Sequence, residues 1–572
     1  MNIQVKRLYD YWKNANLADY DLVEDLENVD GKEEEINDRF YRYLDFGTAG
    51  LRGILGAGTN RMNIYTVGLA TQGYANFLKK NAVNPTVVIG YDSRIKSDVF
   101  AKHAACILAA NGVKVQLFNR LLPTPLVSYA IRKLKTTGGI MITASHNPSK
   151  YNGYKVYGDD GCQIGPEVAD VVAAEMLKID PFKDVLTMDF EKALSTGKVQ
   201  YIVENVLLSF YEKALNERIF HEAIEKTELK IVFTPLNGTG NEPVRKVLEM
   251  AGYKDVFVVP EQEKPDGNFT TCPYPNPEIK EALTLGLKYA KEKDADLLIA
   301  TDPDCDRVGI AVKTNDGYEL LTGNEVGVMM LEYICRGKIE KDVFPKEPVA
   351  AKSLVSTPLT EKICEKYGVE LKSVLTGFKF IGNEITKLEK INKQSNFLMG
   401  YEESYGYLKG IYVRDKDAVT ASLMIAEMAA YYKMKGKSLD KVRNEMYNEN
   451  GYYLNHTENY SFPGEAGTQK MNELMDSLRE SRLNGVFGLK LVRFVDYGEQ
   501  YEENESGERK PIDLPKSNVL LFGFEKDFTL IVRPSGTEPK IKFYYTTMGE
   551  TKEESMQFYK EVSAKTKIAC GL

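Results

Sequence analysis

Three aspartates in DPDCDR, residues 302–307, have the type and spacing of a metal site. Asp302, Asp304 and Asp306 alternate along a loop that follows an apolar run, so their side chains point the same way and can converge on one hard cation. An all-oxygen set with few protein ligands favours Mg²⁺, whose coordination phosphate oxygens often complete. The same pattern also fits an acidic loop that caps the next element, or an aspartate that acts as a nucleophile.

Ser145, in ITASHNPSKYNGYKVYG (residues 142–158), is the second candidate. His146 is its neighbour, but no G-x-S-x-G elbow surrounds it and no buried aspartate or second histidine is evident that would complete a hydrolase triad. A plain loop residue or a helix N-cap is the simplest alternative. Small flanking residues, Pro148 and the nearby Lys155 favour a serine that accepts and donates a phosphoryl group beside a Mg²⁺ loop.

Two further loops have groups suited to a phosphorylated sugar. RPSGTEPKIK (533–542) combines a fork-shaped cation with hydroxyls and backbone amides that can surround a phosphate, although a turn between strands also fits. GYEESYGYL (400–408) has adjacent carboxylates that can accept hydrogen bonds from sugar hydroxyls or can begin a helix. Lys416 lies between two aspartates, which is also typical of a surface ion-pair cluster.

Alternating strands and helices must position these loops. The β-branched run 86–94 predicts a strand that ends in a polar loop, followed by a helix over 97–112 and a strand over 113–118. The same rhythm returns in 229–240, where a strand leads into a glycine-rich loop, and in 295–312, where a polar loop joins two strands. The candidate loops therefore follow strands.

The two ends of the chain differ from this pattern. Residues 1–40 alternate charged and apolar positions and predict one or two helices. From about residue 455, a helix over 471–482 is followed by alternating strands that indicate an antiparallel sheet. The polar stretch 497–513 predicts an exposed loop within this last part.

These elements predict an α/β fold of four domains. Parallel βα units followed by an antiparallel unit indicate three related α/β domains with mixed sheets and a C-terminal α+β domain, although no strict repeat is detectable. We place the domains at 1–208, 209–322, 323–453 and 454–572.

Composition limits the class of protein. With 572 residues, 43% hydrophobic and 27% charged, the chain is typical of a soluble globular protein with several cores. The 74 basic and 82 acidic residues give a net charge of −8, which argues against nucleic acid or an anionic membrane as the main partner. An anionic ligand would therefore need a local basic pocket.

Cysteine and histidine usage points to a cytoplasmic protein without a disulfide or zinc framework. The seven cysteines are scattered and odd in number, which fits reduced thiols, and four histidines are too few to suggest a multi-histidine metal centre. The first twenty residues lack the apolar run of a signal peptide, and no apolar stretch reaches the ~18–20 residues that would span a bilayer.

Six motifs, in order along the chain, carry a family resemblance. They are FGTAGLRG (46–53), TASHNP (143–148), DPDCDR (302–307), TGFKFIG (376–382), EESYG (402–406) and RPSGTEPK (533–540). Together they resemble the α-D-phosphohexomutase family, and specifically its long phosphoglucomutase-like branch, over essentially the whole chain. The resemblance implies a heart-shaped enzyme of four domains, each of which contributes a motif to a central cleft.

The resemblance also implies the chemistry of that cleft. Ser145 would be phosphorylated in the resting enzyme and would hold Mg²⁺ together with Asp302, Asp304 and Asp306. The phosphoserine would pass its phosphoryl group to a sugar monophosphate, and the bound bisphosphate would return its other phosphoryl group to Ser145. Glucose 1,6-bisphosphate would be the intermediate and activator. The residues around the transfer centre would be Arg52, His146, Lys155 and Arg307.

Substrate contacts follow from the same resemblance. Glu402 and Ser404 would bind sugar hydroxyls in both orientations of the sugar. Lys155 and Lys416 match positions assigned to general acid/base catalysis or substrate contact in different branches, and Lys379 matches a lysine that contacts substrate. Burial near a cation would give such a lysine the lowered pKa that proton transfer needs. The phosphate that does not react would be held by Arg533, Ser535, Gly536 and Thr537.

The sugar loop departs from the GE-x-S-GH form of many bacterial members. Tyr401 replaces the leading glycine, Tyr405 stands where glycine is common, and no histidine follows. EESYG is closer to the form of glucose-selective branches, so we predict interconversion of glucose 1-phosphate and glucose 6-phosphate. A related branch of similar length acts on pentose phosphates, so the alternatives are a phosphopentomutase or phosphomannomutase. More distant alternatives are a Mg²⁺-dependent phosphatase with Asp302 as nucleophile and a sugar-phosphate sensor without activity.

The expected partner is a sugar phosphate, with no nucleic acid and no membrane, and the protein is expected to be a monomer or weak homodimer. Because the bisphosphate must reorient without escaping, we expect the last domain to close over the cleft.

Overall fold

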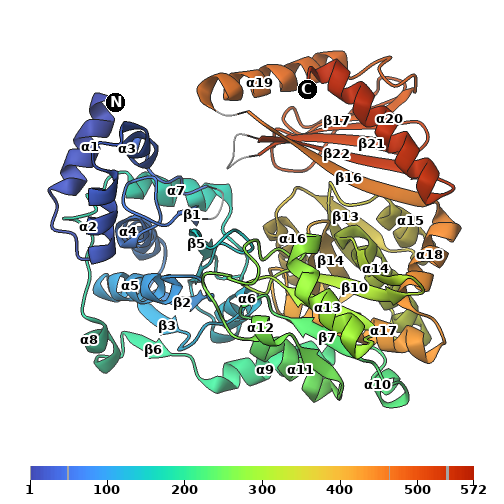
Figure 1. The fold of residues 1–572 in the computed structure, drawn as a ribbon, viewed down its shortest axis with the longest axis horizontal. Helices are drawn as coiled ribbons and strands as arrows, with labels where there is room; N and C mark the ends of the chain where they lie inside the picture. Colours follow the sequence, from blue (N-terminus) through green and yellow to red (C-terminus); the bar gives the residue numbers. More distant parts are fainter. Residues whose placement is uncertain (1, 48–49, 463, 536–539) are drawn as a thin grey trace.

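The computed structural model describes residues 2–47, 50–462, 464–535 and 540–572, without the side chains of 464–466. Within these ranges the chain forms four β-sheets with helices packed against them (Figure 1). The predicted fold class is confirmed, because three α/β units with mixed sheets are followed by a C-terminal unit with a sheet of its own.

The first unit has a six-stranded mixed sheet in the order β1-β5-β4-β2-β3-β6. β2 pairs in parallel with β3 and β4, whereas β5 runs antiparallel between β4 and β1. The strands are β1 (Gly50–Ile54), β2 (Thr86–Tyr91), β3 (Lys114–Leu117), β4 (Gly138–Ile142), β5 (Tyr151–Tyr157) and β6 (Val199–Tyr201). The helices are α4 (Ile64–Asn81), α5 (Ser97–Ala110), α6 (Thr124–Leu134), α7 (Pro166–Met176) and α8 (Phe190–Ser195).

Three helices precede this sheet: α1 (Ile3–Lys13), α2 (Tyr20–Val29) and α3 (Glu33–Phe40). The prediction of one or two helices over residues 1–40 is therefore wrong. Asp19 caps the start of α2 with its side chain, and Gly31 adopts a left-handed φ of +77° just before α3, so the segment is interrupted twice.

The second unit has a five-stranded sheet in the order β11-β10-β9-β7-β8. Its strands are β7 (Ile231–Thr234), β8 (Val256–Val258), β9 (Leu297–Thr301), β10 (Val308–Thr314) and β11 (Gly317–Leu321). Its helices are α9 (Glu204–Asn216), α10 (Glu222–Lys226), α11 (Asn241–Ala251), α12 (Pro260–Glu263), the 3₁₀ helix η1 (Lys280–Leu283) and α13 (Thr284–Lys293).

The third unit has a four-stranded sheet in the order β13-β12-β14-β15. Its strands are β12 (Val349–Ser353), β13 (Glu370–Val374), β14 (Phe397–Glu402) and β15 (Gly406–Lys409). Its helices are α14 (Gly323–Glu340), α15 (Leu359–Tyr367), α16 (Phe378–Lys390), the 3₁₀ helix η2 (Gln394–Asn396), α17 (Ala418–Met434) and α18 (Leu439–Asn450).

The fourth unit has a seven-stranded antiparallel sheet in the order β16-β22-β21-β20-β17-β18-β19. Helices α19 (Gly464–Ser481) and α20 (Lys552–Cys570) lie on its outer side (Figure 1). The strands are β16 (Tyr452–Ser461), β17 (Leu491–Asp496), β18 (Tyr501–Asn504), β19 (Arg509–Pro511), β20 (Leu520–Phe524), β21 (Phe528–Pro534) and β22 (Lys540–Gly549). The loop predicted over 497–513 thus contains two strands. They lie at one edge of the sheet, where β19 is exposed, β18 is half-buried, and both are mostly polar or charged, so apolar alternation is absent.

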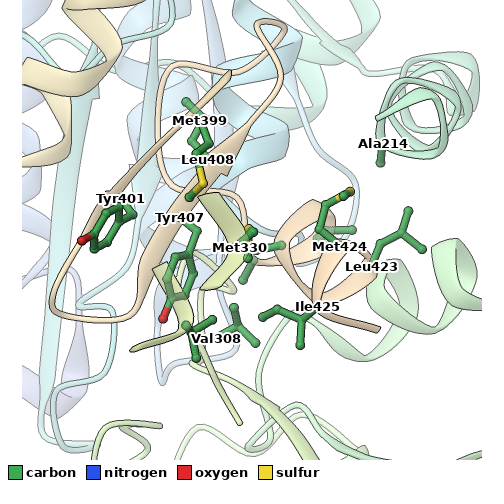
Figure 2. Packing of buried hydrophobic residues seen from close by; sticks show 14 of the residues in the cluster. Ala214, Val308, Met330, Met399, Tyr401, Tyr407, Leu408, Leu423, Met424 and Ile425 are labelled. Carbon is green, nitrogen blue, oxygen red and sulfur yellow. The ribbon is translucent and has the colours of Figure 1, made fainter. Parts of the chain in front are cut away.

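Helix α17 ties the second and third units together. Residues 418–432 of this helix are all buried, which is typical of a helix surrounded by other elements. Figure 2 shows part of this core: Leu423, Met424 and Ile425 of α17, Met330 of α14, Val308 of β10, and Tyr407 and Leu408 of β15. Because Asp417 caps the start of α17 through the N–H groups of Val419 and Thr420, the preceding residues are held in a fixed place.

The predicted domain divisions after residues 208 and 453 fall inside α9 and β16, whereas the division after 322 coincides with the N-cap of α14. The exact domain limits stay predictions. Over the part of the chain that the structure describes, the helices are too short or too polar to cross a membrane.

Candidate active site

The three aspartates of DPDCDR gather in the loop between β9 and β10. These strands are paired antiparallel, so the loop turns back on itself. Asp302 Oδ1 accepts hydrogen bonds from the backbone N–H groups of Asp306 (3.1 Å) and Arg307 (3.0 Å), which folds the loop around this carboxylate. All three aspartates are buried, and one oxygen atom of each lies within 4.8 Å of the others.

This cluster fits a divalent cation. Asp304 Oδ1 and Asp306 Oδ1 are buried without a hydrogen-bond partner among the residues that the structure describes, although a buried carboxylate oxygen normally has one. Burial and the charges of Asp304 and Asp306 raise the pKa of Asp302 well above its usual value. A hard cation such as Mg²⁺ takes oxygen ligands of this kind and offsets the repulsion between them. A loop that only caps the next element leaves the two bare oxygens unexplained.

Ser145 lies beside this cluster, on a turn that follows β4. Its Oγ donates to Asp302 Oδ2 at 3.0 Å, across 157 residues of sequence, and lies 3.2 Å from His146 Nδ1. Its φ is +53°, a left-handed value that a residue with a side chain seldom adopts. The helix N-cap alternative is wrong, because the next element after Ser145 is strand β5.

The imidazole of His146 is neutral near pH 7. Burial, together with the positive charges of Arg307 and Arg52, lowers the pKa of His146 well below its usual value. A neutral ring can either donate or accept a hydrogen bond at the serine hydroxyl. Arg52, on β1, is exposed and donates to Asn147 Oδ1 at 3.3 Å, so it borders the same loop.

Two lysines from different units approach the aspartates. Lys155 of β5 places Nζ 2.8 Å from Asp304 Oδ2 and 3.4 Å from Asp306 Oδ2. Lys416, just before α17, places Nζ 3.1 Å from both Asp306 Oδ2 and Asp415 Oδ1. Because Lys416 is buried, its interpretation as part of a surface ion-pair cluster is wrong.

The lowered pKa expected for these lysines is also contradicted. Burial lowers the pKa of Lys155 and of Lys416, but the carboxylates around each one more than offset burial and raise it overall. Both lysines are therefore fixed positive charges near neutral pH. Burial does lower the pKa of Lys379, which faces fewer carboxylates.

Arg307 connects the metal loop with the sugar loop. Its Nη1 pairs with Glu278 at 2.5 Å, and its Nε lies 3.9 Å from Asp306 Oδ1. The backbone of Arg307 forms a bridge with Gly406, and the N–H of Val308 donates to the carbonyl oxygen of Tyr405 at 3.1 Å. DPDCDR and EESYG therefore lie side by side.

The EESYG loop forms the turn between β14 and β15, so the alternative of a helix start is wrong. Glu402 is buried and its Oε1 accepts from the N–H of Gly377 at 2.7 Å. Glu403 Oε2 accepts from Ser353 Oγ at 2.7 Å, and burial together with the charge of Glu402 raises the pKa of Glu403 to about 7. Ser404 is half-buried at the tip of the turn.

The remaining predicted contacts lie around this loop. Lys379, in the first turn of α16, is half-buried and its Nζ donates to the carbonyl oxygen of Ile164 at 3.4 Å. Arg533 and Ser535 lie at the end of β21 and are half-buried. Tyr544 of β22 belongs to one buried cluster with Leu354 and Val355, next to the Ser353 that donates to Glu403, so the fourth unit packs on the third unit close to the sugar loop. Gly536 and Thr537 lie outside the described residues.

The structure thus brings one group of predicted residues into direct contact and places the rest around it. The group in contact consists of Ser145, His146, Lys155, Asp302, Asp304, Asp306, Arg307 and Lys416. Arg52 borders this group. Glu402 is near enough for its charge to act on Arg307 and Lys416.

Two contacts of this group were missed by the motif analysis. Thr124, the first residue of α6, donates its hydroxyl to Asp304 Oδ2 at 2.8 Å and its N–H to the carbonyl oxygen of Asp304 at 2.9 Å. Glu278 pairs with Arg307. A threonine before a proline and a glutamate after one are common at the starts of helices and turns, so neither has a signal of its own in the sequence.

Comparisons with known proteins match most of the chain. Three family models match this chain. They are phosphoglucomutase/phosphomannomutase alpha/beta/alpha domain I at residues 44–183, domain II at 209–317 and domain III at 322–449. A phosphoglucomutase from Staphylococcus haemolyticus is 37% identical over 522 residues, which cover 91% of this chain and 93% of that protein. One from Staphylococcus aureus is 36% identical over 530 residues, 92% of each chain.

Solved structures agree on the fold. The crystal structure of the exocytosis-sensitive phosphoprotein parafusin, a phosphoglucomutase from Paramecium, superposes with a TM-score of 0.69. The superposition covers 92% of this chain and 94% of that one at 18% sequence identity, so the likeness concerns the fold alone.

Proposed function

Because the chain belongs to the phosphoglucomutase/phosphomannomutase family, we propose that it interconverts glucose 1-phosphate and glucose 6-phosphate through a phosphoserine formed on Ser145. One observation carries this proposal: the hydroxyl of Ser145 donates to Asp302 within a cluster of three buried aspartates, two of which have an oxygen without a hydrogen-bond partner among the described residues. A serine at this place can pass a phosphoryl group on and take one back.

Asp302, Asp304 and Asp306, together with the phosphorylated Ser145, would hold Mg²⁺. When bound, this ion supplies positive charge that neutralises the phosphoryl group during transfer. The protein's own cations add to this charge. Lys155 would stay charged and hold Asp304 and Asp306 in place, while Arg307 and Arg52 would face the phosphoryl oxygens.

The serine hydroxyl and the sugar would be oriented by neighbouring groups. Neutral His146 would hydrogen-bond to the Oγ of Ser145, and Lys416 would link the transfer centre with the sugar loop. Glu402 and Ser404 would accept and donate hydrogen bonds to sugar hydroxyls, with Lys379 as a further contact. The phosphate that does not react would be bound by Arg533, Ser535, Gly536 and Thr537.

The bound intermediate would be glucose 1,6-bisphosphate, which has a phosphate at each end of the sugar. Because either end must face Ser145 in turn, the bisphosphate would turn over within the cleft while the fourth unit closes over it. The same compound would activate the enzyme by restoring a lost phosphoserine. The glucose preference is supported by the EESYG loop and by the phosphoglucomutases that the chain resembles at 36–37% identity.

We also propose a cytoplasmic monomer or weak homodimer. Free thiols at all seven cysteines, six of them buried, support a reducing compartment.

The test combines a product assay with the intact mass of the protein. Wild type, Ser145→Ala and the control Ser195→Ala, an exposed serine of α8, would each receive glucose 1-phosphate, mannose 1-phosphate or ribose 1-phosphate with Mg²⁺. We expect a phosphate-sized mass increase and isomerised glucose phosphate from wild type and Ser195→Ala, and loss of activity by a factor of about a thousand or more for Ser145→Ala.

Normal turnover by Ser145→Ala, or free phosphate as the product, would overturn the phosphoserine mechanism and make Asp302 the candidate nucleophile. Faster turnover of mannose or ribose phosphate would leave the mechanism in place and replace glucose as the preferred sugar.

A further inference from the structure

Arg94 is the last residue of the YDSR segment (91–94), in which β2 ends, and it makes an unusual set of contacts with the loop that contains Ser145. It is 3% exposed, and its guanidinium donates to four backbone carbonyl oxygens. Nη2 bonds to the oxygens of Ser145 and Asn147, each at 2.5 Å, and Nη1 to those of Pro148 and Tyr151, each at 3.0 Å. One side chain therefore holds the whole connection from Ser145 to the start of β5.

The backbone at Ser145 needs such support. Its φ of +53° is in the left-handed region, where a residue with a Cβ is strained. A strained conformation at a functional residue persists only when the surrounding structure determines it from several directions. At Ser145 the N–H donates to Thr143 Oγ1 at 2.8 Å, and the carbonyl oxygen is held by Arg94. The direction of the Ser145 hydroxyl toward Asp302 follows from this backbone conformation.

Arg94 is itself held on two sides. Asp92 Oδ2 lies 3.3 Å from its Nε, and both side chains are fully buried. Asp92 is fixed in turn, because its Oδ1 accepts from the N–H of Arg94 at 3.0 Å and from Ser97 Oγ at 2.7 Å. On the other side, the ring of Phe269 lies 5.0 Å from the guanidinium carbon, a cation–π contact.

Phe269 belongs to the second unit, the unit that supplies the three aspartates. It is fully buried, with a φ of +50°. Two residues earlier, Gly267 approaches so closely that a Cβ there would lie 2.8 Å from the backbone nitrogen of Ile95. The segment around Phe269 is thus seated directly on the YDSR segment. Through Arg94, it connects the second unit with the backbone of Ser145.

We propose that Arg94 is a positioning residue for phosphoryl transfer. Its guanidinium fixes the backbone of Ser145, and Phe269 holds that guanidinium in place relative to the three aspartates. The inference rests on the proposed function, because it assigns Arg94 to the step in which Ser145 exchanges its phosphoryl group. Arg94 touches carbonyl oxygens and not substrate. Its loss therefore slows the transfer step and leaves substrate binding intact.

The test uses the full chain and compares Arg94→Lys, Phe269→Leu, the double variant of these two changes, and Arg443→Lys with wild type. The matched control is Arg443, on α18 of the third unit. Its side chain is also buried, at 7% exposure, and it pairs with Glu319 at 2.9 Å. Three quantities are measured: kcat and KM for glucose 1-phosphate with Mg²⁺, the single-turnover loss of the phosphoryl group from phosphorylated enzyme by intact mass, and the melting temperature.

We expect Arg94→Lys to lower kcat and the single-turnover rate about 100-fold, with KM unchanged within about twofold, because a small displacement of a reacting group costs about this much. Phe269→Leu lowers the same rates about tenfold, and the double variant is no slower than Arg94→Lys alone. Arg443→Lys lowers the melting temperature and leaves both rates unchanged. If the Arg94 variant does not fold, Phe269→Leu alone decides the proposal through its rates.

A wild-type rate for Arg94→Lys, a matching rise in KM, or equal rate losses in Arg443→Lys would overturn the inference alone. A wild-type protein that forms no product and takes up no phosphoryl group would overturn the proposed function and this inference with it.

Discussion

At the scale of single residues, the site is a cluster of buried charges of both signs. The negative charges of Asp302, Asp304 and Asp306 face the positive charges of Lys155, Lys416 and Arg307, with closest pairs at 2.8, 3.1 and 3.9 Å. A buried charge without such a partner costs several kcal/mol. A phosphoryl group brings additional negative charge to this set, and a divalent cation is the means by which such a site accommodates it.

The variant Lys155→Met tests how these charges affect Mg²⁺ binding and catalysis. Lys155→Met removes a cation 2.8 Å from Asp304, so the carboxylates should bind Mg²⁺ about tenfold more tightly, while kcat falls about 100-fold because transfer loses a stabilising charge. Initial rates at increasing Mg²⁺ concentration measure both quantities. The control is Lys366→Met, which removes ion pairs with Glu449 at 3.1 Å and Glu332 at 3.2 Å in the third unit and should change neither quantity. A weaker response to Mg²⁺ in Lys155→Met would contradict this account.

At the scale of elements, strand ends present the chemical groups. Ser145 follows β4, Asp302 follows β9, Glu402 ends β14, and Arg533 lies near the end of β21. Side chains at such ends leave the packed sheet and can meet groups from other elements. Helix starts complete the arrangement, because α6 begins at Thr124 beside the metal loop and α17 begins just after Lys416.

Thr124→Val tests the contribution of α6. The hydroxyl of Thr124 donates to Asp304 Oδ2 at 2.8 Å, while Oδ1 accepts no hydrogen bond from the described part of the chain. Removing a group that orients a metal ligand typically weakens metal binding 10–100-fold, so the Mg²⁺ concentration for half-maximal rate should rise by at least about tenfold. Thr71→Val, a buried threonine of α4 whose hydroxyl bonds to Val67, should leave it unchanged. Equal Mg²⁺ responses in the two variants would rule out this role.

His103 on α5 gives the first unit a dependence on pH. The side chain is partly buried beside Gly68 of α4, and burial lowers the pKa of His103 from 6.5 to about 4. As the pH falls below 6.5, the unfolded chain therefore takes up a proton that the folded chain takes up only near pH 4. The stability that His103 contributes is complete above pH 6.5 and is lost between pH 6.5 and 4.

His103→Gln should remove this dependence. Between pH 7 and 5 the wild-type loss due to His103 amounts to about 1–2 kcal/mol, after allowance for its partial exposure. The urea midpoint of the variant should consequently fall less over this range than that of wild type. Parallel falls in the two proteins would show that His103 is not the group responsible.

At the scale of the whole molecule, the last sheet has two apolar faces with different partners. One face packs against α19 and α20 and includes Phe528, Leu530, Val532, Phe543 and Tyr545. The other face, with Leu521, Ile531 and Tyr544, packs against loops of the third unit that contribute Leu354, Val355 and Leu375. Successive residues of β21 point to opposite faces, so Leu530 belongs to the core of the fourth unit and Ile531 to its contact with the third unit. Substitutions at these two positions can therefore affect stability and docking separately.

Ile531→Ala and Leu530→Ala make this separation measurable. Ile531→Ala weakens docking on the third unit, so KM for the sugar phosphate should rise several-fold and hydrogen exchange should quicken around residues 354–355. Leu530→Ala opens the core under α20 and should cost about 2–5 kcal/mol of stability in the fourth unit. Identical effects on KM in both variants would contradict separate roles for the two faces.

The sequence by itself determined the family, the class of fold and the chemical types at the site. These are recorded locally, in the alternation of Asp302, Asp304 and Asp306, in the β-branched run that forms β2, in the apolar run that forms β9, and in motifs no longer than ten residues. Helix and strand periodicities depend on neighbours along the chain, which is why they can be predicted. Two predictions were wrong because their local signal is weak. A single residue, Gly31, separates two of the N-terminal helices, and the strands β18 and β19 are too polar to show apolar alternation.

Only the tertiary structure decided how these groups act on one another. The hold of Arg94 on the Ser145 loop spans 51 to 57 residues, and the contact of Thr124 with Asp304 spans 180. No regular spacing in the sequence indicates which of such distant segments will touch, so these contacts could not be predicted. The raised pKa values of Lys155 and Lys416, opposite to the expectation from burial, arise mainly because carboxylates of other segments lie close to them, Asp304 and Asp306 beside Lys155 and Asp306 beside Lys416. A pKa depends on the sum of charges in space, and the fold alone brings those charges together.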